Sequence, residues 1–116
     1  MKKWKVLGKT MINQIITLGK IAELPTLKKT PRGNSVTTIM LEVTRNFRNS
    51  DGRYEKDLMQ FTLWKGIAET TVAVASVGDL LAIKGHIQTS SYENAEGVVY
   101  YNYELIAEKV TFIASK

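Results

Sequence analysis

Three aromatic side chains in this sequence stand among polar or basic residues, where large apolar rings are unusual. In the segment DLMQFTLW, residues 57–64, strand alternation places Met59, Phe61 and Leu63 on one face. Trp64 falls on the opposite, mostly polar face. Flat rings beside Lys and Arg are what unpaired nucleobases need, because bases stack on the rings while the cations hold phosphates. The chemistry indicated is therefore stacking and charge pairing.

Tyr92 and Phe47 repeat the pattern. In the next strand-like segment Leu81, Ile83 and Ile87 mark the inward face, so the outward face includes Tyr92 by continuation. Phe47 lies just past another predicted strand, in what we expect to be a solvent-facing loop with three arginines. The outward residues before Tyr92 are Lys84, His86 and Gln88, and the arginines are Arg45, Arg48 and Arg53.

Other aromatic residues have a different prediction. Strand alternation places Tyr101 and Tyr103 on the same face as the inward residues Val99 and Leu105, so we expect them to be packed. For each outward ring, burial in a dimer interface or in the core is the alternative to base stacking.

Positive charge is unevenly distributed. The chain of 116 residues carries a formal net charge of +5. Residues 1–10 hold four lysines, and residues 20–53 hold seven basic side chains against three acidic ones. Residues 54–116 hold five basic against eight acidic side chains. A basic half suggests a partner with a negative surface, although a solvated surface gives the same pattern.

Five strand-like segments must position these residues. Each is rich in β-branched, aliphatic or aromatic residues and is bounded by turn residues. Between the third and fourth, residues 67–77 predict one helix, with Gly78 placed to cap its end. This order predicts an all-β chain folded as a five-stranded OB (oligonucleotide- and oligosaccharide-binding) barrel with one α-helix between strands 3 and 4; a small SH3-like barrel or a sandwich is the alternative. The segments are 13–21, 35–45, 56–64, 80–90 and 98–106.

The chain length indicates one domain with a basic N-terminal extension. We expect residues 11–116 to form the OB domain and residues 1–10 to form the extension. Gly8, Lys9 and Thr10 resemble the end of a phosphate-binding loop, but Lys3 stands where that motif needs a glycine. A basic arm and sequence upstream of an initiator Met11 both remain open for this segment.

Composition argues against several function classes. The chain has no cysteine and one histidine, His86, which excludes thiolate zinc sites, cysteine nucleophiles and multi-histidine metal sites. Glu55 and Asp57 share a face, but they lie on a hairpin flank where solvated carboxylates are usual. No apolar run approaches the roughly 18 residues of a membrane span. We expect no enzyme activity, no metal, no cofactor and no membrane insertion.

Taken together, the motifs resemble those of the bacterial single-stranded DNA-binding proteins. The resemblance runs from Met11 to Ile113, and the motifs keep the family's order and spacing. They are MINQIITLGKI, TPRGNSV, VTRNF, LWKGIAE, VGDLLAIKGHIQTSSYENAEG and YNYELIAEKVTF.

The resemblance implies an OB fold, a homotetramer, and sequence-tolerant wrapping of single strands in DNA replication, repair and recombination. It places the stacking aromatics at Phe47, Trp64 and Tyr92, with Leu58 where the family has a fourth ring. We further expect a cytoplasmic, nucleoid-associated protein of bacterial, plasmid or phage origin. The predicted phosphate-binding residues are Lys20, Lys28, Lys29, Arg32, Arg45, Arg48, Arg53, Lys65 and Lys84.

Family members often continue into an acidic C-terminal tail that recruits other proteins, whereas this sequence stops at TFIASK. We therefore expect a short form without tail-dependent partners, although a shortened chain would have the same sequence. The competing function is an OB-type protein-interaction module that binds nucleic acid weakly or not at all. RNA binding also stays open, because stacking tolerates either backbone.

Overall fold

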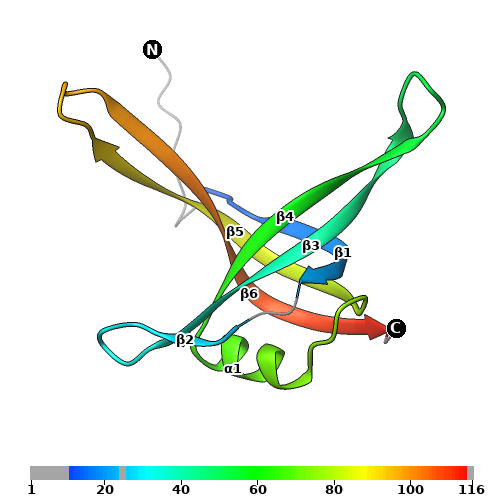
Figure 1. Ribbon diagram of the computed structural model, residues 1–116, viewed down its shortest axis with the longest axis horizontal. Helices are drawn as coiled ribbons and strands as arrows, with labels where there is room; N and C mark the ends of the chain where they lie inside the picture. Colours follow the sequence, from blue (N-terminus) through cyan, green and yellow to red (C-terminus); the bar gives the residue numbers. More distant parts are fainter. Residues whose placement is uncertain (1–10, 24–25, 115–116) are drawn as a thin grey trace, which may run out of the picture.

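Six strands and one helix make up the part of the chain that the structure, a computed structural model, describes: residues 11–23 and 26–114 (Figure 1). The predicted basic extension, residues 1–10, lies outside this part. The elements are β1 (Ile15–Glu23), β2 (Lys28–Lys29), β3 (Ser35–Arg48), β4 (Tyr54–Trp64), α1 (Lys65–Val74), β5 (Leu80–Glu93) and β6 (Val99–Ala114).

The five long strands close into a barrel. They are hydrogen-bonded in the order β1, β5, β6, β4 and β3, and β3 pairs with β1 to complete the circle. All these pairings are antiparallel except β4 with β6, which is parallel. The two-residue β2 adds to the edge of β3. The predicted OB barrel is confirmed, and the helix lies between the third and fourth long strands.

The core follows the predicted strand alternation. Phe61 and Leu63 of β4 are fully buried, and Met59 packs partly buried against them. In β5 the inward positions are Leu81, Ile83 and Gly85. The remaining large buried residues are Ile21, Ile39 and Leu41. Alternation thus selected the correct inward face of β4 and of the barrel part of β5.

Two hairpins extend beyond the barrel as separate arms (Figure 1). The β3–β4 arm turns at Gly52 and the β5–β6 arm at Gly97, both with positive φ, which glycine adopts without strain. Ile87, predicted to face inward, is 38% exposed, because β5 extends past the core at this residue. The strands of both arms are longer than the sequence predicted.

The helix begins and ends earlier than expected. Trp64 is its N-cap residue, and Lys65 adopts a left-handed backbone conformation with φ of 54°. The helix stops at Val74, so Gly78 is not its cap. Gly78 instead turns the chain toward β5, and its N–H donates to the carbonyl of Ile21 at 2.9 Å. Within the described residues, no helix has the length and apolar character needed to cross a bilayer.

Candidate nucleic-acid interface

A groove opens on the barrel where β4 and β6 part. Their parallel pairing covers only Phe61 with Leu105 and Thr62 with Ile106, and the two arms diverge beyond it. The groove has a volume of about 590 Å³. Its walls combine apolar, aromatic and polar side chains: Val36, Thr38, Leu58, Met59, Gln60, Thr62, Trp64, Tyr103, Glu104 and Leu105.

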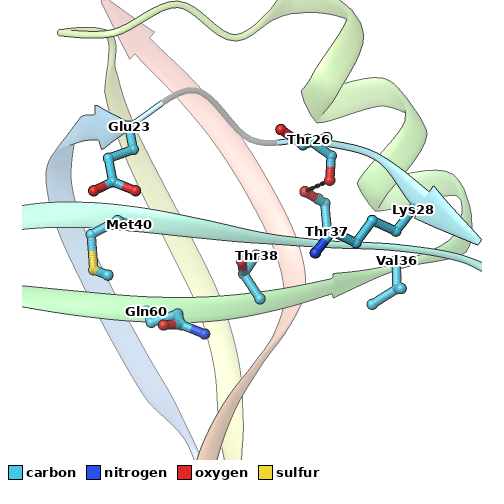
Figure 2. A pocket seen from close by; sticks show the side chains of 8 residues that line it. All are labelled: Glu23, Thr26, Lys28, Val36, Thr37, Thr38, Met40 and Gln60. Atoms are coloured by element: carbon cyan, nitrogen blue, oxygen red, sulfur yellow. Dashed lines mark hydrogen bonds between the residues drawn. The ribbon is translucent and has the colours of Figure 1, made fainter.

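A second hollow of about 360 Å³ adjoins this groove. The two share Val36, Thr38 and Gln60 as lining residues, so the barrel surface is indented continuously from β2 across to β6. Figure 2 shows the second hollow, where the Thr37 hydroxyl donates to the carbonyl of Thr26 at 2.8 Å. Its other lining residues are Glu23, Lys28 and Met40.

Trp64 lies at the end of β4, on the outer face predicted from alternation. It is 39% exposed and lines the groove, as does Leu58, which is 64% exposed. Thr62 shares this face but is buried where β6 pairs with β4, and its hydroxyl donates to Glu104 at 2.8 Å. The outer face of β4 therefore brings one indole ring and one exposed leucine to the groove, and Thr62 holds the carboxylate of Glu104 beside them.

Phe47 lies in the β3–β4 arm, beyond the end of the groove that Leu58 lines and far from Trp64. It is exposed and belongs to the outer end of β3, not to a loop as predicted. Arg48 pairs with Tyr54 at the base of the turn, and its guanidinium lies 5.4 Å from the centre of the Tyr54 ring. Ten residues of β4 separate Tyr54 from Trp64, which at about 3.3 Å each is about 30 Å.

Tyr92 lies in the other arm and is already stacked on a neighbour. Its ring centroid is 5.2 Å from that of Tyr100, with 20° between the planes, and both rings are exposed. Tyr101 and Tyr103, on the opposite face of the same arm, are 65% and 74% exposed. The prediction that these two are packed is wrong, because their inward face continues past the barrel into solvent.

Arg45 is held by two carboxylates across the β3–β4 pair. Its guanidinium forms two hydrogen bonds to Asp57, at 2.9 and 3.0 Å, and one to Glu55 at 2.9 Å. The hydrogen bonds raise the pKa of Arg45 and lower that of Asp57 from their ordinary values. Sequence reasoning treated Glu55 and Asp57 as solvated and Arg45 as a phosphate ligand.

The other predicted basic residues are exposed, and within the described part of the chain none of them forms an ion pair. Lys28 lines the second hollow, and Lys65 directly follows Trp64. Lys20 and Lys84 lie on β1 and β5, on the barrel wall away from β4, so the structure does not bring them to the groove. Lys29 is on β2, Arg32 is in the turn after it, and Arg48 and Arg53 flank the turn of the β3–β4 arm.

His86 has partners that the sequence did not reveal. Its Nε2 lies 2.7 Å from Gln88 Oε1, and its Nδ1 lies 2.5 Å from Glu108 Oε2. Gln88 Oε1 and Glu108 Oε2 are both acceptors, so the doubly protonated ring satisfies both contacts. The hydrogen bonds to Gln88 and to Glu108 raise the pKa of His86 above its ordinary value. The contact between His86 and Glu108 links β5 to β6.

Comparison with known proteins gives consistent matches. The profile described as "Single-strand binding protein family" matches residues 12–113. Single-stranded DNA-binding protein B of Bacillus subtilis is 40% identical over 106 residues, covering 91% of this chain and 94% of the relative. The single-stranded DNA-binding protein of Enterococcus faecalis is 37% identical and covers 91% of this chain, which spans 56% of that relative.

A solved structure shares the fold. It is the crystal structure of a deletion mutant of the single-stranded DNA binding protein from Thermus aquaticus, with a TM-score of 0.74 and 18% identity. The match covers 90% of this chain and 52% of that chain. At this identity the likeness supports the barrel topology alone.

Proposed function

Because this chain belongs to the single-strand binding protein family, we propose that it binds single-stranded DNA without sequence preference. Trp64 carries this proposal: its ring is on the polar outer face of β4, partly exposed in a groove, and followed directly by Lys65. A base stacked on the ring and a phosphate held by the lysine would use the two contacts that sequence-tolerant binding needs.

Phe47 and Tyr92 are proposed as the other stacking residues. Both rings are exposed, and each lies on a different arm, so a strand would reach them by leaving the groove in two directions. The outer face of Tyr92 is the one available, because Tyr100 occupies the other face. Proposed phosphate contacts are Lys20, Lys28, Lys29, Arg32, Arg45, Arg48, Arg53, Lys65 and Lys84. Among them Arg45 is the one already engaged by carboxylates, because three of its five N–H donors bond to Glu55 and Asp57.

The protein is also proposed to act as a homo-oligomer, most simply a tetramer. The outer face of β1 exposes Ile16 and Leu18, and Met11 and Ile12 just before it are almost fully exposed. A run of uncovered apolar side chains on a barrel wall is typical of a surface that another copy covers. We propose that the assembly coats single strands during replication, repair and recombination in the bacterial cytoplasm, on chromosomal, plasmid or phage DNA.

A protein-interaction module is the second candidate. The observation in its favour is the exposure of Tyr101 and Tyr103, because large aromatic rings are also enriched in protein interfaces. This candidate predicts that removing an exposed ring alters assembly but leaves DNA binding unchanged.

Titration of intrinsic fluorescence separates the two. The chain has two tryptophans, so a Trp4→Phe background leaves Trp64 as the sole reporter. Oligo-dT should quench its emission. A plot of the logarithm of the binding constant against the logarithm of the salt concentration should have a slope of about −0.7 for each phosphate contacted. Matched single-stranded RNA and duplex DNA at two salt concentrations establish the partner class. Absence of salt-sensitive binding to any single strand rules out the proposal.

A Trp64→Ala variant then tests the residue itself. We expect weaker binding of oligo-dT with the oligomer intact. Loss of the oligomer with DNA binding unchanged would favour the protein-interaction module.

A further inference from the structure

We infer that Tyr103 is an additional base-stacking residue, which supplies the groove with a second ring where Leu58 offers none. The inference rests on the proposed function and extends it by one residue. Four observations support it: the exposure of Tyr103, its place in the groove, its level relative to Leu58, and the continuation of its face along the arm.

Exposure singles out Tyr103 among the aromatic side chains. At 74% it is the most exposed aromatic residue that the structure describes, ahead of Tyr101 and the predicted stacking residue Phe47. A tyrosine ring has a large apolar area, and burying it in a contact is favourable. Solvent covers this ring in the single chain, so it is available to a ligand.

Position in the groove connects Tyr103 with Trp64. Both residues line the same cavity, although they come from strands that are far apart in the sequence. Parallel pairing puts Leu105 beside Phe61, so Tyr103, two residues earlier, is level with Met59 and within one residue of the level of Leu58, which lines the same groove. Trp64 is about five residues further along the groove, or about 17 Å at 3.3 Å per residue. One ring therefore stands toward each end of the groove.

The occupant that this arrangement fits is a nucleobase. Tyr103 is neutral, and the nearest charged side chain on its strand, Glu104, is turned to the outer face, where it accepts from Thr62. A phosphate would be repelled by that carboxylate, whereas the face of a base stacks on the ring without needing a charge. Tyr101 is two residues away on the same face and is also exposed, so the aromatic surface continues outward along the arm.

Substitution at Tyr103 tests the inference against matched controls. Tyr103→Ala should weaken oligo-dT binding by about 5- to 150-fold, the range for one stacked base. Tyr103→Phe keeps the ring and should stay within about twofold of the parent. Thr111→Ala changes an exposed residue of β6 outside the groove and should leave affinity unchanged. The salt dependence of Tyr103→Ala should match that of the parent, because no phosphate contact is lost.

A direct reporter provides a second measurement that does not depend on truncating the side chain. In a Trp4→Phe, Trp64→Phe background, Tyr103→Trp places the only tryptophan at the inferred contact, and oligo-dT should quench its emission. Unfolding curves and light scattering show whether each variant keeps the fold and the assembly of the parent.

The results distinguish this inference from the function on which it rests. If the parent binds and Trp64→Ala weakens binding while Tyr103→Ala does not, the function stands and Tyr103 is not a stacking residue. Loss of the oligomer in Tyr103→Ala would also overturn the inference and would place this ring in a protein interface. A parent protein that binds no single strand removes both proposals.

Discussion

Replacing Leu58 by Trp is expected to tighten the binding of single-stranded DNA. Leu58 is 64% exposed on the same face of β4 as Trp64 and lines the same groove. Six residues separate the two, which at about 3.3 Å each is about 20 Å along the strand. A ring at position 58 therefore meets a different base from the one that Trp64 contacts.

The size of the gain follows from the side chain that is replaced. A base stacked on an aromatic ring contributes about 1–3 kcal/mol, measured as the loss on truncation to alanine. Leucine already offers some apolar contact, so the gain from Leu58→Trp should lie in the lower part, about 1–2 kcal/mol. Because 1.4 kcal/mol is tenfold in affinity, we expect binding about 5- to 30-fold tighter.

Fluorescence anisotropy of a labelled oligo-dT measures this change at a salt concentration where the parent is half-saturated in the micromolar range. Val74→Trp is the matched control, because it adds the same ring at an exposed position at the far end of α1, outside the groove. The control should bind like the parent. If Leu58→Trp folds and assembles normally but binds no tighter than Val74→Trp, stacking in this groove does not determine affinity.

Two further predictions concern the β5–β6 pair. Gly85→Ala should lower the free energy of unfolding in urea by at least about 2 kcal/mol, because its Cβ would lie 2.0 Å from the carbonyl oxygen of Ile106 and force the strands apart. The imidazole of His86 should titrate by NMR above its ordinary pKa, because Gln88 and Glu108 accept from the charged ring. That raised pKa stabilises the fold below about pH 6.5, and the contribution should be lost as pH rises through the folded value.

Each of these has a matched control. Gly66→Ala adds a Cβ with no atom within 4 Å and should raise stability by about 0.5–1 kcal/mol, since alanine favours a helix more than glycine does. Equal urea midpoints for both alanine variants would contradict the steric argument at Gly85. His86→Gln should remove the pH dependence assigned to the ring, and an imidazole that titrates at or below pH 6.5 would contradict the assigned contacts.

The barrel was predictable from sequence because its signals are local. Met59, Phe61 and Leu63 alternate with polar residues, and alternation alone fixes which face of a strand is inward. The turns at the tips of the two arms were equally clear, since Gly52 and Gly97 stand where positive φ is required. Strand order then left few ways to close five strands into a barrel with one helix outside it.

Burial outside the barrel was not predictable in the same way. Ile87, Tyr101 and Tyr103 have inward parity, yet all three are exposed because the strands that carry them outrun the core. Alternation reports a face, whereas burial depends on what lies opposite it. The ion pair between Arg45 and Asp57 was not predictable either, because it depends on the β3–β4 register, which the sequence did not reveal.

The distances between the proposed stacking rings determine the path that a DNA strand must take across the protein. Phe47 is about 30 Å along one arm from Trp64, and Tyr92 is on the other arm beside Tyr100, five residues, or about 17 Å, from the level where β6 joins β4. A strand that contacts all three must cross the fork between the arms, and the groove lies on that path. Since each ring meets a different part of the DNA strand, removing one ring should weaken binding without abolishing it. The number of nucleotides that the protein contacts should also fall.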